Sequence, residues 1–174
     1  MARLDIRIFG DPVLRMRALE VTEFDDALRE LADDMIDALR AAQGVGLAAN
    51  QVGVLKRLFV WEHDDAGGVF VNPEIVETSL DTDIADEGCL SFPGLFYPSE
   101  RPLRARLRGV DVHGEPFEET GEGLRARILL HELDHLNGIL FIDHLARHDR
   151  KDAMRRIRRG ELENPPIDVS AREL

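Results

Sequence analysis

The stretch that organises this chain is His131-Glu132-Leu133-Asp134-His135, inside a segment from about Glu122 to Asn137 whose pattern predicts a helix that ends at Gly138. Residues four apart lie on one face of a helix, so both imidazoles can reach a single metal ion. Glu132 lies about 60° around the helix from His135, which puts it beside such an ion and near a water molecule. This is the zinc-hydrolase pattern with the glutamate as general base. Two histidines that meet by chance beside a surface glutamate are the alternative.

A catalytic metal site needs a third protein ligand and one open position. The extended form of the pattern places a third histidine six residues after the second, but Phe141 stands there and cannot ligate. Other zinc hydrolases use a glutamate farther downstream. The glutamates at such a distance, Glu161 and Glu163, belong to a polar tail that we expect to be extended or mobile.

Two other side chains are candidates for the third ligand. His144 and His148 form a second pair four residues apart, but arginines and a lysine surround them, and positive neighbours disfavour a cation. We therefore interpret that pair as solvated surface. Cys89 is the single cysteine, and a lone cysteine is ordinarily a small buried hydrophobe. Its neighbours, Glu87-Gly88-Cys89-Leu90-Ser91, include a glycine that permits close backbone approach, so Cys89 stays a candidate.

The rest of the chain predicts a single domain of helices and strands. A helix is expected from Asp25 to Gln43, with Asp25 as its N-cap, Gly44 as its stop and an apolar stripe that includes Leu28 and Met35. A shorter basic helix is expected from Asp149 to Gly160. Strand-like segments, joined by glycine-containing connections that suggest antiparallel hairpins, cover residues 55–61, 69–78, 103–112 and 116–120.

Composition narrows the class of protein. The 174 residues fit one domain, which we place at residues 1–160, followed by the polar tail at 161–174. The net charge of −12 argues against nucleic-acid binding by the whole surface, and we expect no DNA partner. No apolar run approaches the roughly 18 residues of a membrane span, and the first residues lack the pattern of a signal peptide. A single cysteine fits the reducing cytoplasm.

Three motifs together resemble the signatures of peptide deformylases. They are Gly44–Gln51 (GVGLAANQ), Glu87–Ser91 (EGCLS) and His131–His135 (HELDH), in the order and near the spacing of that family, and the likeness runs from about residue 5 to about 150. The resemblance implies hydrolytic removal of the formyl group from the N-terminal N-formylmethionine of nascent polypeptides. It also implies an α+β fold, a single compact domain with antiparallel strands packed around the central metal-binding helix.

The resemblance also implies roles for single residues. It makes Cys89, His131 and His135 the ligands of one divalent metal ion, Fe²⁺ natively, with Zn²⁺ or Ni²⁺ as substitutes and water as the fourth ligand. Glu132 is implied as the general acid and base that works with metal-activated water. Gln51 and the backbone N–H of Leu90 are implied as donors to the developing oxyanion, a task that suits an uncharged amide.

Substrate binding is expected along the first motif. Gly44 and Gly46 leave the main chain open for an extended peptide, and Val45 can line the pocket for the methionine side chain. Arg127, one helical turn before His131, stands where the family commonly has an apolar pocket residue, and Leu130 where a glutamine is common. We also expect Arg101 to pair with Glu87 and so hold the cysteine segment.

The basic helix predicts a further partner. Residues 147–159 hold seven Lys or Arg and two Asp, a net charge of +5 in a chain of net charge −12. A solvated helix is one interpretation. Since deformylases act on nascent chains, our hypothesis is contact with ribosomal RNA near the exit tunnel. Two other functions stay open, namely an inactive relative that only binds the ribosome and a zinc peptidase in which Cys89 is merely buried.

Overall fold

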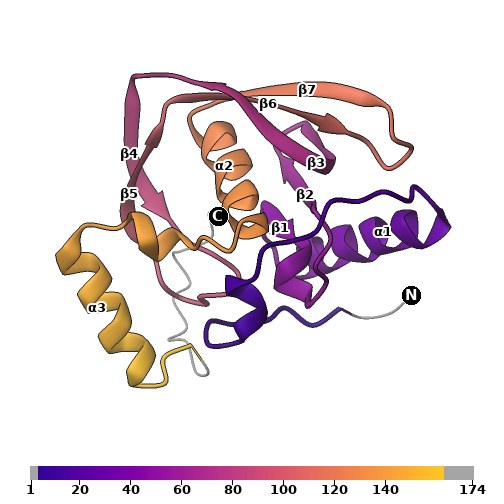
Figure 1. Cartoon of the computed structure of the whole chain (residues 1–174). Helices are drawn as coiled ribbons and strands as arrows, with labels where there is room; N and C mark the ends of the chain where they lie inside the picture. Colours follow the sequence, from indigo (N-terminus) through magenta and orange to yellow (C-terminus); the bar gives the residue numbers. More distant parts are fainter. Residues whose placement is uncertain (1–3, 163–174) are drawn as a thin grey trace.

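The computed structural model describes residues 4–162, and it has helix α2 (Leu124–Leu136) at its centre with strands on several sides (Figure 1). Helix α1 (Asp26–Ala41) lies against the sheet on one side, and helix α3 (Arg147–Arg158) projects at the opposite end. Three short 3-10 helices complete the helical part: η1 (Pro12–Arg15), η2 (Ala49–Val52) and η3 (Phe141–His144). The α+β fold that the resemblance implied is confirmed.

All the paired strands are antiparallel and form two sheets. The larger has the order β1-β2-β3-β6-β7, and the smaller pairs β4 with β5. Their bounds are β1 Gly46–Ala48, β2 Leu58–His63, β3 Ala66–Thr78, β4 Thr82–Glu87, β5 Tyr97–Pro102, β6 Arg104–Val110 and β7 Pro116–Glu122. The four predicted strands correspond to β2, β3, β6 and β7 with shifted ends, whereas β1, β4 and β5 were not predicted.

Strand β2 separates two apolar clusters because its side chains alternate between the faces of the sheet. Phe59 and Trp61 face α2 and pack in the cluster that holds Leu129 and Leu133. Leu58 and Val60 face the other way, into the cluster beneath α1. The sheet is thus covered on both faces, and α2 is held from more than one side.

Helix α1 begins as predicted but ends differently. The Asp25 carboxylate accepts a hydrogen bond from the Leu28 N–H at 2.9 Å, as an N-cap does. The helix ends at Ala41, two residues before the predicted end, and the left-handed residue is Gln43, with φ of 56°. Gly44 takes part in the stop through its N–H, which donates to the Leu39 carbonyl at 3.1 Å. A Cβ at Gly44 would lie 2.8 Å from a terminal methyl of Leu90, so a side chain there would have to displace the end of that leucine.

Helix α2 spans nearly the predicted range, and ten of its residues are buried. Its chain leaves at Gly138, whose φ of 72° suits glycine, as expected. A side chain at Gly138 would also meet the backbone of Arg15. Because α2 is enclosed, the polar side chains on it are held in the interior and need partners there.

Helix α3 starts two residues before the predicted Asp149 and packs on a third apolar cluster through Ala153, Met154 and Ile157. Two residues that the sequence assigned to the tail are held to the domain, since Leu162 is buried in the same cluster and Glu161 accepts a hydrogen bond from Arg156 at 2.6 Å. The rest of the predicted tail, residues 163–174, lies outside the described residues. Within residues 4–162, no helix is long and apolar enough to cross a membrane.

Candidate metal centre

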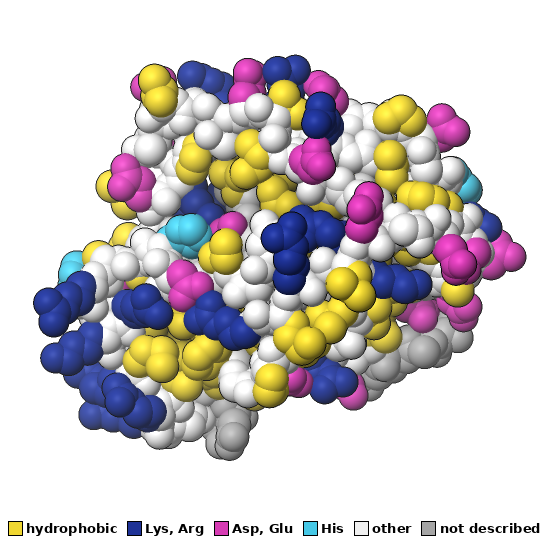
Figure 2. All heavy atoms as spheres, viewed as in Figure 1, with side chains coloured by type: hydrophobic (Ala, Val, Ile, Leu, Met, Phe, Trp, Pro, Cys, Tyr) yellow, Lys and Arg dark blue, Asp and Glu magenta, His cyan; other side chains and the backbone are white. Residues whose placement is uncertain are grey.

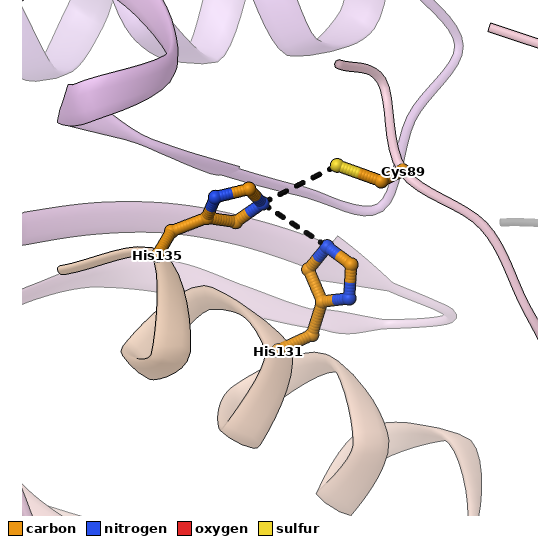
Figure 3. Close-up of side chains that lie close together, drawn as sticks. All are labelled: Cys89, His131 and His135. Atoms are coloured by element: carbon orange, nitrogen blue, oxygen red, sulfur yellow. Dashed lines mark hydrogen bonds between the residues drawn. The ribbon is translucent and has the colours of Figure 1, made fainter. Parts of the chain in front are cut away.

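Three donor atoms converge where α2 faces the segment that follows β4. The Nε2 atoms of His131 and His135 lie 3.2 Å apart, and Sγ of Cys89 lies 3.3 Å from Nε2 of His135 (Figure 3). All three ligand atoms lie within 4.8 Å of one another, and both histidines are buried. The structure therefore brings together the three residues that the sequence predicted as ligands.

The separations fit a metal ion with tetrahedral ligands. Metal–nitrogen bonds of about 2.0–2.1 Å and a metal–sulfur bond of about 2.3 Å correspond to ligand–ligand separations of roughly 3.3–3.6 Å. The observed 3.2 and 3.3 Å are close to these values. One thiolate and two imidazoles suit Fe²⁺, Zn²⁺ or Ni²⁺ better than Mg²⁺ or Ca²⁺, which prefer oxygen ligands.

Local structure explains how Cys89 reaches the helix. Strand β4 ends at Glu87, and the Ser91 N–H points back to the cysteine sulfur at 3.4 Å. A side chain at Gly88 would collide with the ring of Phe96, so only glycine lets this backbone pass. The glycine that made Cys89 a candidate in the sequence is thus required for the sulfur to face α2.

Glu87 contacts the ring of His131 at Nδ1, the nitrogen that is not a proposed metal ligand. Its Oε1 lies 2.7 Å from Nδ1 of His131, which leaves Nε2 free to ligate. Burial tends to raise the pKa of Glu87, but hydrogen bonds from His131 and Arg101 lower it well below its usual range. The predicted Arg101–Glu87 pair is confirmed, with N–O distances of 2.6 and 3.0 Å.

Arg127 departs from the expected pocket residue. It is 2% exposed, and its Nη1 donates to Oε2 of Glu87 at 2.8 Å and to the Ser99 carbonyl at 2.9 Å. The sequence signalled only that an arginine stood on the ligand face. Its hydrogen-bond partners lie 28 to 44 positions away, so the contacts could not be read from local spacing. Leu130, where a polar residue is common, packs in the apolar core instead.

Glu132 lies beside the three donors and is 4% exposed. Burial raises its pKa to about 7. Its Oε2 has no hydrogen-bond partner within residues 4–162, which is unusual for a buried carboxylate oxygen. A Cβ on Gly46 would overlap Oε1, so glycine at this position makes room for the carboxylate.

Gln51 presents its amide nitrogen to the same place. The Nε2 atom lies 3.5 Å from Cys89 Sγ and donates to the Ser91 hydroxyl at 3.1 Å. Its Oε1 accepts from the Ala48 N–H at 2.9 Å, which fixes the side chain so that the amide nitrogen points to the cysteine. The role of Ser91 as a partner was not predicted, although it belongs to the same motif.

A small pocket opens beside the donors. It brings together all but Gly44 and His135 of the residues that the sequence predicted for metal, catalysis and substrate. Its lining is Val45, Gly46, Gln51, Glu87, Gly88, Cys89, Leu90, Arg127, Ile128, His131 and Glu132. The combination of apolar walls with convergent polar groups is typical of a small-molecule or peptide site.

The second histidine pair forms no such site. His148 has a side chain 82% exposed, in agreement with the prediction of solvated surface. His144 differs from that prediction in part, because its Nε2 contacts a carboxylate oxygen of Asp134 at 2.8 Å and its side chain is only 34% exposed.

Sequence comparisons match the chain to one family. The profile of the family described as polypeptide deformylase matches residues 3–151. A peptide deformylase from Acidothermus cellulolyticus is 50% identical over 169 residues, which cover 97% of this chain and 93% of that protein. Another from Thermotoga neapolitana is 50% identical over 140 residues, with 80% and 85% of the two chains covered.

Solved structures of similar proteins have the same fold. A peptide deformylase from Legionella pneumophila has a TM-score of 0.86 and 40% identity, and the match covers 95% of this chain and all of that one. The enzyme from Synechococcus elongatus, in complex with actinonin, has a TM-score of 0.84 and 40% identity, with 88% and 85% of the chains covered.

Proposed function

The chain belongs to the peptide deformylase family, whose members remove the formyl group from the N-terminus of nascent peptides, and we propose that Cys89, His131 and His135 hold the metal for this reaction. The convergence of the three donor atoms within 4.8 Å is the observation that carries the proposal. A bound ion supplies Lewis-acid chemistry, lowering the pKa of water and polarising the formyl carbonyl.

Glu132 is the proposed general base and acid. It takes a proton from the attacking water and passes it to the amine nitrogen as the C–N bond breaks, so that formate and a free N-terminus leave. Its position supports this role, because the carboxylate lies beside the donors and Oε2 is unoccupied by any described side chain. Glu132 does not ligate in this proposal. Three protein ligands leave the fourth position of a tetrahedral ion for water, and a fourth protein ligand would fill it.

Gln51 and the backbone N–H of Leu90 are the proposed donors to the oxyanion. The amide of Gln51 points to Cys89 and is fixed by the Ala48 N–H, so little reorganisation is required when charge develops on the formyl oxygen. Leu90 directly follows the cysteine ligand and lines the pocket. An uncharged donor stabilises the oxyanion without neutralising the carboxylate of Glu132.

Val45 and the glycines on either side of it form the proposed substrate-binding edge. Val45 and Gly46 line the pocket, and the apolar side chains of Leu90 and Ile128 contribute to its wall. A methionine side chain fits such a wall by apolar contact. The peptide main chain is expected to pair with residues 44–46 as an added strand.

The metal is proposed to be Fe²⁺, with Zn²⁺ and Ni²⁺ as substitutes. A thiolate with ferrous iron is open to oxidation, so the iron form is expected to lose activity in air. We assign the protein to the cytoplasm, where nascent formylated chains are made and a lone thiol stays reduced.

Hydrolysis of formyl-Met-Ala-Ser, followed by the release of formate under anaerobic conditions, tests the main proposal. Removal of metal with a chelator should abolish turnover, and Fe²⁺ or Ni²⁺ should restore it. Acetyl-Met-Ala-Ser is the matched control substrate. Turnover that persists in metal-free protein would count against a metal-dependent reaction at this site.

We also propose that α3 binds ribosomal RNA near the exit tunnel. Lys and Arg gather over α3, whereas acidic side chains predominate over α1 (Figure 2). The apolar side of α3 packs against the rest of the domain, and the Tyr97 hydroxyl donates to Asp152 on α3 at 2.7 Å. The cations are thereby left at the surface, where they can contact phosphate.

Charge reversal tests this contact better than truncation, since removal of α3 would uncover the apolar cluster beneath it. Lys151→Glu with Arg158→Glu should weaken ribosome binding and reduce its salt dependence by about one phosphate contact per residue. Arg17→Glu with Lys56→Glu, two exposed cations outside α3, is the charge-matched control. Equal binding by the two double variants would contradict the proposal.

A further inference from the structure

We propose that Arg127 is a positioning residue of the metal centre. It fixes the carboxylate of Glu87 and, through that carboxylate, the ring of His131. The proposal rests on the assignment of Cys89, His131 and His135 as metal ligands and extends it to a side chain that reaches neither metal nor substrate through its charged group.

The carboxylate of Glu87 is held on both oxygens. Oε1 contacts His131 Nδ1 at 2.7 Å and accepts from Arg101 Nη2 at 2.6 Å. Oε2 accepts from Arg101 Nε at 3.0 Å and from Arg127 Nη1 at 2.8 Å. A carboxylate with donors in all four directions cannot turn about its last torsion without breaking hydrogen bonds, so the ring it holds is fixed as well.

Arg127 contributes something that Arg101 cannot. Arg101 reaches Glu87 from β5, whereas Arg127 lies on α2 itself, four residues before His131 and on the same face. The helix that carries two proposed ligands therefore donates a hydrogen bond directly to Glu87. Because Glu87 lies two residues before Cys89, this contact also sets the cysteine segment relative to α2.

Arg127 ties the small sheet to α2 as well. Its Nη1 donates to the Ser99 carbonyl on β5 at 2.9 Å, and its Nη2 donates to the Asp83 carbonyl on β4 at 3.1 Å. The planar guanidinium can bond three groups in fixed directions, which the single ammonium of a lysine cannot do equally well. These three hydrogen bonds join β4, β5 and Glu87 to the helix that carries the proposed ligands.

The charges at this position are balanced within the protein. Glu87 lies between two buried arginines, while Asp134 contacts Arg101 at 2.7 Å and the Asp83 carboxylate lies 3.6 Å from Arg127. The guanidinium of Arg127 is thus committed to protein groups. We infer that its charge is not offered to the substrate, and that the pocket it helps to line keeps an apolar character.

Loss of the Arg127 guanidinium should weaken metal binding without abolishing it. In Arg127→Met the volume of the side chain is largely kept, but Oε2 of Glu87 loses one of its two donors. Groups that support a ligating histidine typically change metal affinity about 10–100-fold. We expect a comparable acceleration of metal release, with a smaller effect in Arg127→Lys.

Release of Co²⁺ from the loaded protein into excess chelator, together with the visible absorption of the bound ion, tests the proposal. Arg127→Met should release Co²⁺ about 10–100-fold faster than the unsubstituted protein and shift the absorption, because the ligand geometry changes. Arg125→Met is the matched control, since Arg125 lies two residues away on α2, over the ring of Trp61, with a side chain 33% exposed. Its release rate and spectrum should stay unchanged.

A purely structural role for Arg127 would lower the thermal stability of the metal-free protein while leaving release and spectrum as in Arg125→Met, and that result would overturn the proposal. If Arg127→Met does not fold, Arg127→Lys is measured in the same way. Binding of Co²⁺ by the unsubstituted protein tests the proposed metal site itself. The ratio of the Co²⁺ release rates of variant and unsubstituted protein tests the role of Arg127 alone. Glu87→Gln should accelerate release less in the Arg127→Met background than by itself, since both changes disturb one contact.

Discussion

Two histidine pairs with the same four-residue spacing have opposite fates in this protein. His131 and His135 are buried with their Nε2 atoms 3.2 Å apart, whereas His144 and His148 bind separate carboxylates at the surface. The difference lies in the backbone between them. The first pair belongs to one continuous helix, so its rings share a face.

The second pair spans a break between two helices. His144 is the last residue of η3 and His148 is in the first turn of α3, with Leu145 and Ala146 extended between them at ψ of 149° and 150°. Spacing alone therefore predicts a metal site only where the helix is unbroken. A third donor is also required, and Cys89 supplies it for the first pair alone.

The largest effect is expected from removing that third donor. Cys89→Ser removes the strongest donor of the set. The first histidine pair should then bind metal poorly, as the second pair does for want of a third donor. Purified protein should contain little or no bound metal and show no measurable formate release. Full metal content with normal turnover in this variant would remove Cys89 from the ligand set.

Substitution of Glu132 should separate chemistry from metal binding. Glu132→Gln keeps the shape of the side chain and removes the base, so kcat should fall about 10²–10⁴-fold while metal content is unchanged. Metal analysis and steady-state kinetics on the same sample distinguish the two effects. If metal is lost together with activity, Glu132 is a ligand and the proposed division of roles is wrong.

Gln51→Leu tests the donor that faces the first pair from η2. Removal of one oxyanion donor typically costs about 10²–10³ in kcat, and KM should change little. The measurement is kcat and KM with formyl-Met-Ala-Ser. A change confined to KM would reassign Gln51 to binding of the ground-state substrate.

Gly46→Ala should displace Glu132, the proposed base, without changing a proposed ligand. A Cβ at this position overlaps the Glu132 carboxylate, so that side chain must move. Displacement of a catalytic group by about 1 Å can cost on the order of 10² in rate. Gly68→Ala is the control, because a Cβ there meets nothing within 4 Å. Equal activities in the two variants would show that Glu132 has room to adapt.

The smallest effect is expected from the second pair. His148→Ala should leave metal content and kcat within about twofold, since changes to exposed side chains have little effect. His144→Ala removes the contact with Asp134 and should cost roughly 1 kcal/mol of stability, with metal content unchanged. A loss of metal in either variant would show that the two pairs are not independent.

Much of this arrangement could be predicted from local sequence. The helix over 122–137, the N-cap at Asp25 and the four long strands depend on neighbouring residues, and the structure places them nearly as predicted. The three proposed ligands were predicted because two share a helix face and the third lies in a motif that resembles one of the family's signatures. Their meeting point, however, required the family resemblance.

The missed elements lack local signals. Strand β4 reads TDIADE and β5 reads YPSERP, compositions rich in acidic residues and proline that disfavour strands. They form a sheet because they pair with each other and are held to α2 by Arg101 and Arg127. The pairing of Glu87 with these arginines joins residues 14 and 40 positions apart, which no periodicity encodes.

An X-ray absorption spectrum of the metal in freshly isolated, anaerobic protein tests the central claim most directly. The spectrum resolves the elements bound to the ion and their distances. We predict one sulfur at about 2.3 Å, with nitrogen or oxygen neighbours at about 2.0–2.2 Å that include two imidazoles. A metal without a sulfur neighbour, or one with a single imidazole, would contradict the assignment of Cys89, His131 and His135 as its ligands.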